Sequence, residues 1–362
     1  MKIGIDGYPL TIPFPCGSKT YAAQLINGIA KIDKKNQYYI FSKKTVRLPK
    51  QKNFKLVKIP NLLPIFKRQL VFPYLVKKLQ LDLFHFLEPY GIIIKIHPKI
   101  ITTVHDYNLE YTYPFGRFPF ERINTEFFRF FTFRNSKTFI TPTDTIKKEF
   151  YRSTHISNVY TIPEGVSGNF RVLGTIKKPP QKFLLAMGDF APRKNIPNVL
   201  KAYKRLPAKI KKQYKLIIVA STISSKEIFL KIIHEQNLRK NVKVLHNVST
   251  LKLVELYNTA SCFLYPSLYE GFGIPILEAM ECGCPVITSN RGAVKEVAGD
   301  AAIFINPKSP LQISEAIKKL LANKRLSRSL KLKGLGRVKK FSWQKTAKKT
   351  LEIYEKVHMS PQ

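Results

Sequence analysis

Hydrophobic positions along this chain alternate between short continuous runs and longer stretches with a helical repeat. The short runs predict strands, and they recur from end to end, at Lys2–Ile5, Tyr38–Phe41, Leu83–Phe86, Ile100–Val104, Asn135–Thr141, Asn158–Ile162, Phe183–Met187, Lys215–Ala220, Lys243–Leu245, Cys262–Tyr265, Pro285–Thr288 and Ala302–Ile305. Between them, apolar side chains recur at helical spacing, as at Tyr21, Leu25 and Ile29, and predict helices such as 19–32 and 195–205. Strands that alternate with helices are typical of parallel, doubly wound sheets, so the predicted fold class is α/β.

One stretch interrupts this alternation and indicates a linker. Residues 165–182 have no clean periodicity and contain two glycines and two prolines, at Gly168, Gly174, Pro179 and Pro180. A chain of 362 residues is long enough for two hydrophobic cores. We therefore expect one domain over 1–172 and a second over 173–341.

The most informative segment is Ser267–Ser289, which predicts a glycine turn and a short helix between two strands. Pro275 suits the first helical turn, and Gly283 suits a left-handed residue at the helix end. Glu270 stands just before the glycine turn, and Glu278 lies in the first helical turns. A helix N-terminus attracts anions, whereas carboxylates accept hydrogen bonds from hydroxyls. The segment therefore predicts a site for a phosphate that carries hydroxyl-rich groups.

This segment resembles the donor-site signature of the retaining glycosyltransferases usually called family 4. The family pattern is E-x7-E within PS-x-x-EGFG-x-P-x-LEAM, and it is met by Pro266, Ser267, Glu270, Gly271, Phe272, Gly273, Pro275, Leu277, Glu278, Ala279 and Met280. The resemblance implies that Glu270 holds hydroxyls of the transferred sugar and that Glu278 holds the ribose hydroxyls. It also implies that the turn formed by Gly271, Phe272, Gly273 and Ile274 binds the donor, with N–H groups of Phe272 and Gly273 contacting the sugar and diphosphate.

Other segments resemble the same family and are spread over the whole chain. They are the opening strand and glycine loop around Gly17, the T-V-H-D strand end with His105, the I-P-N-G-V segment in which Glu164 replaces the usual asparagine, the phosphate-binding turn that begins at Gly188, and a C-terminal helix over 342–358 that crosses back onto the first domain. The resemblance implies the GT-B fold, in which two Rossmann-like domains face each other across a cleft.

Three further residues complete the candidate site. Arg193 and Lys194 lie in the turn between a predicted strand and helix, where a guanidinium and an ammonium could neutralise a departing nucleoside diphosphate without a metal. The alternative for them is a solvated basic pair. His105 ends an apolar strand, and the resemblance implies that it contacts the transferred sugar. The candidate catalytic residues are thus His105, Glu270, Arg193 and Lys194.

The charge of the chain is unusual for a globular protein. Sixty-two basic residues against 23 acidic ones give a net charge of +39, spread over both halves of the sequence. Such an excess favours anionic partners such as lipid headgroups, nucleotide-sugars or nucleic acid, although a lysine-rich composition alone would also produce it. The chain has no RNP, KH or zinc-finger pattern, so no nucleic-acid partner is expected. A basic protein that binds nucleic acid or a membrane surface without transferase activity is the alternative function.

The remaining composition limits cofactors and location. Four cysteines are too few for a disulfide framework, and the sequence contains no Asp-x-Asp, so neither a metal nor a cofactor is expected beside a GDP- or UDP-linked substrate. The chain starts directly with a strand, and no apolar run is long enough for a membrane span. We therefore expect a cytoplasmic protein, either soluble or peripheral on the membrane surface.

Two segments of the first domain mix aromatic with basic side chains. Residues 60–81 contain Phe66, Phe72, Tyr74, Lys67, Arg68, Lys77 and Lys78, and residues 121–137 contain Phe127, Phe128, Phe130, Phe131, Phe133, Arg122, Arg129 and Arg134. Either the phenylalanines belong to the core and the cations are solvated, or the segments contact an anionic membrane.

Together these observations predict a function. The resemblance implies metal-independent transfer of a hexose, with retention of configuration, from a nucleotide-sugar to a glycan or lipid-linked acceptor in cell-envelope polysaccharide or glycolipid synthesis. The P-R-K-N form of the turn at 192–195 favours mannose carried by GDP over UDP-linked hexoses. Acceptor, linkage and oligomeric state do not follow from the sequence.

Overall fold

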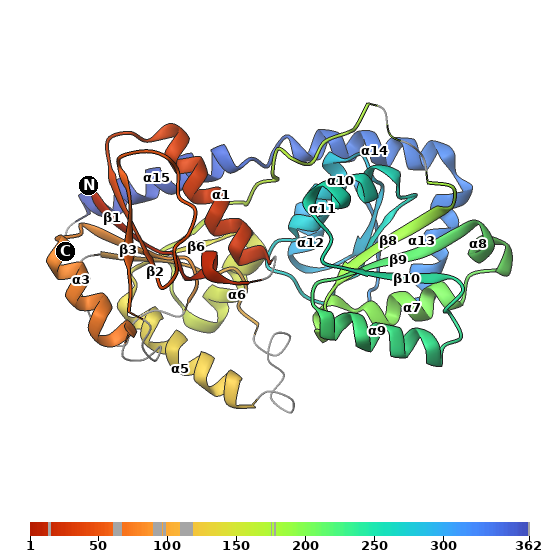
Figure 1. Ribbon diagram of the computed structural model, residues 1–362, viewed down its shortest axis with the longest axis horizontal. Coiled ribbons are helices and arrows are strands. Elements are labelled where there is room, and N and C mark those ends of the chain that lie inside the picture. The colour runs from red at the N-terminus through yellow and green to blue at the C-terminus, as the bar shows by residue number, and fades with distance from the viewer. Residues whose placement is uncertain are drawn as a thin grey trace. The chain divides into compact units, whose positions relative to one another are not determined.

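The chain forms two compact units in the computed structural model (Figure 1). One unit combines Met1–Gly165 with Trp343–Gln362, and the other is Val166–Ser342. The structure describes residues 1–13, 16–60, 67–89, 96, 99–108, 119–174, 176 and 179–360, without the side chains of Lys67, Arg68, Pro119 and Glu121.

Within its described residues, the first unit contains a parallel sheet of seven strands in the order β3-β2-β1-β4-β5-β6-β7. The strands are β1 (Lys2–Asp6), β2 (Gln37–Ser42), β3 (Phe54–Lys58), β4 (Leu83–Phe86), β5 (Lys99–Thr103), β6 (Thr138–Thr141) and β7 (Val159–Thr161). The helical elements are η1 (Tyr8–Thr11), α1 (Gly17–Ile32), the π-helical turn η2 (Lys67–Val71), α3 (Phe72–Leu79), α5 (Pro119–Asn135), α6 (Asp144–Thr154) and α15 (Trp343–Met359).

Helices cover both faces of this sheet because its strands bury alternate side chains on opposite sides. On one face Phe84 and Phe86 of β4 pack against Phe72 of α3. On the other face His85, between them, contacts Tyr354 of α15. Helix α15 therefore belongs to the first unit although it is the last helix of the chain, and it packs along α1.

In the described part of the second unit, six parallel strands are ordered β10-β9-β8-β11-β12-β13. They are β8 (Lys182–Gly188), β9 (Tyr214–Ala220), β10 (Val242–His246), β11 (Phe263–Tyr265), β12 (Val286–Ser289) and β13 (Ala302–Ile305). The helical elements are η3 (Pro192–Lys194), α7 (Ile196–Lys204), α8 (Ala208–Gln213), α9 (Ile223–Glu235), α10 (Thr250–Thr259), α11 (Ile274–Glu281), α12 (Gly292–Ala298), α13 (Pro310–Ala322) and α14 (Lys324–Val338).

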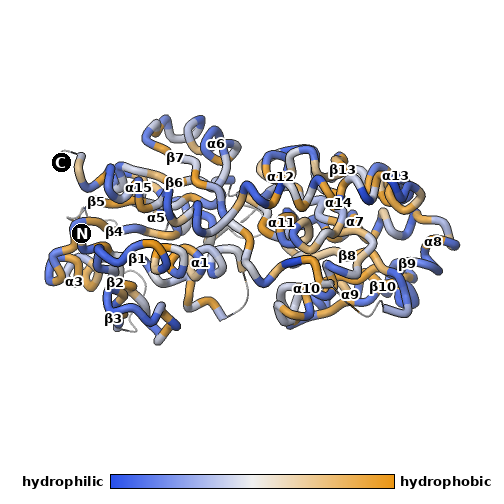
Figure 2. Tube along the Cα trace, turned by 90° about the horizontal axis from the view of Figure 1, so that it is seen from above, coloured by the Kyte–Doolittle hydropathy of each residue, from blue (hydrophilic) through white to orange (hydrophobic). Residues whose placement is uncertain are grey.

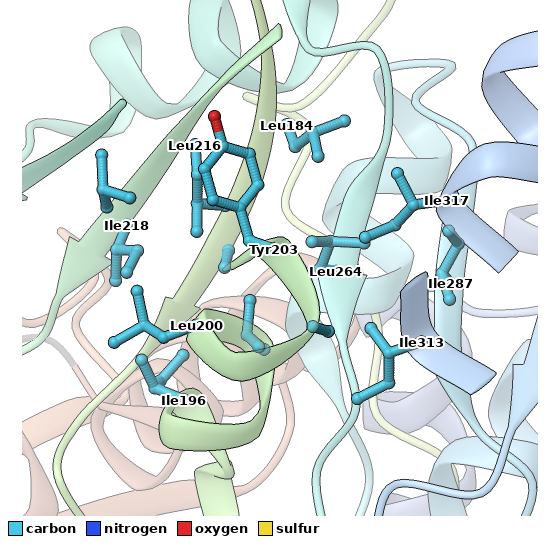
Figure 3. Packing of buried hydrophobic residues seen from close by; sticks show 14 of the residues in the cluster. Leu184, Ile196, Leu200, Tyr203, Leu216, Ile218, Leu264, Ile287, Ile313 and Ile317 are labelled. Atoms are coloured by element: carbon cyan, nitrogen blue, oxygen red, sulfur yellow. The ribbon is translucent and has the colours of Figure 1, made fainter. Parts of the chain in front are cut away.

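The second unit has a core on each side of its sheet. Figure 3 shows one of them, where Leu200 and Tyr203 of α7 and Ile313 of α13 pack against strand residues such as Leu216 and Leu264. The opposite core is formed with α10, α11 and α12, so α7 and α11 lie on different faces (Figure 1). The surface helices alternate hydrophilic with hydrophobic positions, as Figure 2 shows for α13.

The predicted α/β class and its alternating parallel strands are confirmed. The strand that sequence patterning missed is β3, which lies at the sheet edge and pairs only with β2 within the described residues. In its sequence FKLVK, lysines interrupt the apolar residues. The strand therefore contains no continuous apolar run of the kind that predicts a strand from sequence.

The unit boundary also differs from the predicted one at 172/173. It falls at Val166, because the segment after it is anchored in the second unit. Phe170 is buried beside Phe183 and Tyr257, and the Leu173 N–H donates to Oδ1 of Asn258 at 2.9 Å. These two apolar anchors lie among glycines, which is why the segment looked like a linker.

Candidate donor site at a strand-order reversal

Two loops of the second unit meet where the strand order reverses. Strands β8 and β11 are neighbours although two strands lie between them in the sequence, and parallel strands end at the same sheet edge. The loop after β8 contains Arg193, and the loop after β11 contains Leu268, whose N–H donates to the Arg193 carbonyl at 2.7 Å. Asn195 adds a second link, because Nδ2 donates to the Pro266 carbonyl at 2.8 Å.

The acidic and basic candidate residues form one ionic cluster on these loops. Lys194 Nζ lies 2.8 Å from Glu270 Oε1, and Arg193 Nη1 lies 3.2 Å from Glu270 Oε2. The Tyr265 hydroxyl donates to Glu270 Oε1 at 2.9 Å. The side chain of Glu270 is 8% exposed. Burial alone would raise the pKa of its carboxyl, but the charges of Lys194 and Arg193 outweigh burial and lower it, so Glu270 is ionised.

The glycine turn that follows Glu270 leads directly into α11. Gly273 is the N-cap and has φ of 103°, a conformation that an L side chain rarely adopts, and a Cβ there would lie 3.2 Å from Val294 Cγ1. Phe272 and Ile274 are buried, so their contribution to a ligand is the backbone N–H and not the side chain. The N–H groups of Gly273 and Ile274 stand at the N-terminus of α11, where a helix offers them no acceptor, and this suits them for contact with an anion.

Glu278 lies on α11 against α10. The hydroxyl of Tyr257 donates to its Oε2 at 3.4 Å. Burial of the carboxyl raises the pKa of Glu278 to about 7. This carboxyl therefore differs from Glu270: no cation offsets its burial among the interactions that shift it, and it changes charge near neutral pH.

Gly188, at the end of β8, lets the phosphate-type turn fold back over the strand. A Cβ at this position would lie 2.9 Å from Lys194 Cβ and 3.3 Å from Ile196 Cγ1. Any side chain here would push Lys194 away from Glu270, so the glycine is a steric requirement of the ionic cluster.

The first unit holds the other two candidates, His105 and Gly17. His105 follows β5, and its Nδ1 lies 3.0 Å from Glu164 Oε1. Glu88 follows β4, and burial raises the pKa of its carboxyl. Gly17 begins α1, and a Cβ there would meet nothing within 4 Å. The structure thus brings Arg193, Lys194 and Glu270 together in one unit and pairs His105 with Glu164 in the other.

Sequence reasoning missed residues that shape both places. Tyr265 and Asn195 hold the ionic cluster, and Tyr257 contacts Glu278. A signal for Tyr265 was available, because it is the last residue of the strand before the E-x7-E segment. Asn195 was quoted only as part of a motif, and its contacts with Pro266 and with the Pro307 carbonyl at 2.7 Å span more than 70 residues.

Over the residues that the structure describes, no group of three or more histidine, cysteine, aspartate or glutamate side chains could hold a metal ion. No helix within the described ranges is both long and apolar enough to cross a membrane.

The family of the chain follows from two matches. A family model of the glycosyl transferases group 1 matches residues 174–335, and a model of Glycosyltransferase Family 4 matches residues 16–169. The two matches take in most of the chain and correspond to the two structural units. The protein belongs to the glycosyltransferases of this group 1 and family 4 type, as its E-x7-E segment indicated.

Individual proteins resemble parts or all of the chain. The O-antigen chain mannosyltransferase B of Escherichia coli is 34% identical over 194 residues, 54% of this chain and 51% of that protein, so the chain spans about half the length of this curated relative. The sucrose-phosphate synthase of Thermosynechococcus elongatus has a TM-score of 0.80 at 19% identity, with 99% of both chains covered. Anabaena Alr3699/HepE, solved in complex with UDP-glucose, has a TM-score of 0.75 at 14% identity, with 98% of this chain and 100% of that chain covered. The structural likeness shows the GT-B fold.

Proposed function

We propose that this protein transfers a hexose, preferably mannose, from a nucleotide-sugar to a glycan or lipid-linked acceptor. The observation that carries the proposal is the cluster of Arg193, Lys194 and Glu270 at the reversal of strand order, beside the start of α11. The relative from Escherichia coli is a mannosyltransferase of the O-antigen chain, and the Anabaena neighbour binds UDP-glucose, which supports a sugar donor. Polysaccharide assembly at the cell envelope is the process we infer.

The cluster can bind both ends of such a donor. Two cations and one carboxylate leave a net charge of +1, which attracts a diphosphate. Arg193 and Lys194 donate hydrogen bonds to phosphate oxygens, so they stabilise the charge that develops as the sugar–phosphate bond breaks. Glu270 remains an acceptor for a sugar hydroxyl, because a carboxylate has about four lone-pair sites and Arg193, Lys194 and Tyr265 use three of them. Glu278 accepts from the ribose hydroxyls.

The reaction retains the anomeric configuration in this proposal. The bond between the anomeric carbon and the phosphate oxygen breaks with its electron pair left on the phosphate. The acceptor hydroxyl attacks the oxocarbenium-like sugar from the face that the diphosphate leaves, and its proton passes to the departing phosphate oxygen. Arg193 and Lys194 supply the positive charge that this step needs, so we infer that transfer proceeds without a divalent metal.

A membrane surface is a further partner that we infer. Helices α3 and α5 cover the same face of the first sheet, since α3 packs near Ile100 of β5 and α5 near Val104, which directly follows β5 and is four residues further along the chain. The outer side of α5 exposes apolar side chains three or four residues apart, at Phe120, Ile123, Phe127 and Phe130. On α3, Tyr74, Lys77 and Lys78 are exposed. An exposed apolar stripe beside cations fits an anionic lipid interface.

The structure alters which residues form this surface. Phe72 is buried against Phe84, so it belongs to the core, and Arg129 is buried as well. The predicted contributions of Phe66, Lys67 and Arg68 lie outside the described residues or side chains. Exposed Phe127 and Phe130 therefore become the aromatic contacts to test.

A nucleotide-sugar panel tests the proposed function directly. We expect GDP-mannose to raise the melting temperature most, and to release GDP when an acceptor glycan is supplied, with and without excess EDTA. Glu278→Gln should weaken the thermal shift, whereas Glu255→Gln, an exposed change on α10 outside the site, should not. Loss of wild-type turnover in EDTA, restored by magnesium, would contradict metal independence. No response to any nucleotide-sugar, together with salt-dependent retention of nucleic acid, would favour the alternative basic binding protein.

A further inference from the structure

His105 and Glu164 form a partly buried pair that the family resemblance does not account for. Glu164 stands where the resembled pattern has asparagine, and it places a carboxylate oxygen 3.0 Å from His105 Nδ1. Side-chain exposure is 17% for His105 and 6% for Glu164. A carboxylate can only accept, so Nδ1 of His105 bears a proton in this pair.

The second ring nitrogen of His105 has no hydrogen-bond partner anywhere in the described structure. Nε2 is buried, and an enclosed nitrogen without a partner costs free energy that a ligand atom could recover. The ring is held from the side by Tyr21, whose ring meets it edge-on with centroids 4.4 Å apart. The imidazole is therefore fixed at Nδ1 and by Tyr21, and only Nε2 is left to interact. Because Nε2 is buried, the approach of a substrate oxygen requires a side-chain movement on binding.

A second histidine, His85, is fully buried and has no carboxylate partner in the part of the chain that the structure describes, so it shows by contrast how the Glu164 carboxylate affects the pKa of His105. His85 is held by hydroxyls alone, Tyr354 at 2.7 Å from Nδ1 and Thr103 at 2.8 Å from Nε2. Burial, with a smaller contribution from His105, lowers the pKa of His85 to about 3, so this ring is neutral. Burial also disfavours charge on His105, but the hydrogen bond and charge of Glu164, together with the charges of Glu88 and Asp106, outweigh burial and raise its pKa.

The charged and titratable groups around His105 come from four elements. Glu164 follows β7, Glu88 follows β4, Asp106 is in the same loop as His105, and Tyr21 lies on α1. Glu88 and Asp106 act through charge alone, whereas Glu164 adds a hydrogen bond. Asp106 also lies 3.6 Å from Arg129, which offsets its charge. Glu164 is thus the group that most directly controls the ring.

We propose that Glu164 is a positioning residue that holds His105 through Nδ1 and thereby directs an Nε2–H donor at an oxygen atom of the bound substrate. The proposal rests on the proposed transferase function for the identity of that substrate. Nε2 carries a proton only when the ring is an imidazolium, because Nδ1 is already protonated. With a neutral asparagine at position 164, burial would lower the pKa of His105, as burial lowers the pKa of His85 beside its two hydroxyl partners.

The proposal predicts a pH profile set by residue 164. Activity should fall as pH rises through the raised pKa of His105, since the donor at Nε2 is then lost. Glu164→Gln removes the charge but leaves the burial, so the pKa of His105 falls. The basic limb of kcat/KM should move to lower pH by the same amount. A merely structural role would change stability or kcat without moving this limb.

The test titrates the full-length protein by NMR. The chain has seven histidines, and the His105 Cε1–H signal is assigned by its absence in His105→Asn. We expect a wild-type pKa above 6.5, a lower value in Glu164→Gln, and a smaller decrease in Glu88→Gln, which removes a nearby carboxyl but no hydrogen bond to His105. A wild-type pKa at or below 6.5 overturns the proposal even if Glu164→Gln does not fold. An equal decrease in both variants also overturns it.

The titration needs no substrate, so its result is separate from the proposed function. If the pKa behaves as expected and no nucleotide-sugar is turned over, then the transferase function fails while Glu164 still controls the ionisation of His105. If transfer occurs but its basic limb is the same in wild type and Glu164→Gln, then the transferase function stands and the donor role of Nε2 is wrong.

Discussion

At the scale of single residues, the burial of Glu270 decides what its two cations do. Its carboxylate is almost enclosed and is balanced by Arg193 and Lys194. Breaking a buried ion pair by removing one side leaves an uncompensated charge and is strongly destabilising. The cluster is therefore part of the stability of the second unit as well as a candidate site.

This burial gives the first prediction. Arg193→Ala combined with Lys194→Ala should lower the free energy of unfolding by about 3–5 kcal/mol, in addition to abolishing transfer. Adding Glu270→Gln should restore part of the stability, because the unpaired carboxylate is removed. Urea unfolding of the three proteins measures this, and coincident midpoints for double variant and wild type would contradict it.

Glu278 gives a prediction about nucleotide binding, which should strengthen as pH rises, whereas the donor at His105 should be lost as pH rises. Because burial raises its pKa to about 7, it is largely protonated at pH 6 and ionised at pH 8. Ribose hydroxyls donate to the ionised form, so nucleotide affinity should increase over this range, by at most about tenfold per pH unit. The same raised pKa means that its contribution to stability is greatest below pH 4.5 and is lost as pH rises to about 7.

Calorimetric titration with nucleotide at pH 6, 7 and 8 measures the effect. Glu278→Gln cannot ionise and should bind with one weak affinity throughout. A wild-type affinity that is constant across this range would show that the carboxyl does not receive the ribose hydroxyls.

At the scale of elements, the turn into α11 depends on one glycine. Gly273→Ala places a Cβ at φ of 103° and 3.2 Å from Val294, which should destabilise the second unit by about 1–3 kcal/mol and weaken donor binding. Gly17→Ala is the matched control, since Gly17 also stands at a helix start but a Cβ there meets nothing within 4 Å. Thermal unfolding compares the two, and equal melting temperatures would contradict the role of Gly273.

How far the sequence predicted these elements depends on how local their causes are. The predicted strand Leu83–Phe86 coincides with β4, and Gly283 is left-handed as expected, since each depends on a few adjacent residues. The pairing of Arg193 with Glu270 joins residues 77 positions apart, so only the fold could reveal it. Phe170 was missed for the same reason, because its partners Phe183 and Tyr257 are distant in sequence.

At the scale of the whole molecule, the net charge of +39 can be tested for a role in membrane binding, because some of the cations lie close to exposed apolar side chains. In the first unit, exposed apolar side chains of α5 lie on the same sheet face as the lysines of α3. Hydrophobic insertion and attraction of cations to an anionic leaflet reinforce each other, at about 1 kcal/mol for each lysine near the surface. If the excess charge reflects only a lysine-rich composition, then attraction to an anionic leaflet should be weak and hydrophobic insertion should be absent.

Vesicle co-sedimentation separates these cases. Binding should increase with the fraction of anionic lipid, decrease with salt, and weaken in Lys77→Glu with Lys78→Glu. Phe127→Ser with Phe130→Ser should weaken it too, because these side chains are 48% and 60% exposed. Leu251→Ser is the control, since Leu251 is 78% exposed on α10 of the other unit. If the serine changes on α5 have no more effect than the change at Leu251, then the exposed stripe of α5 is not a membrane contact.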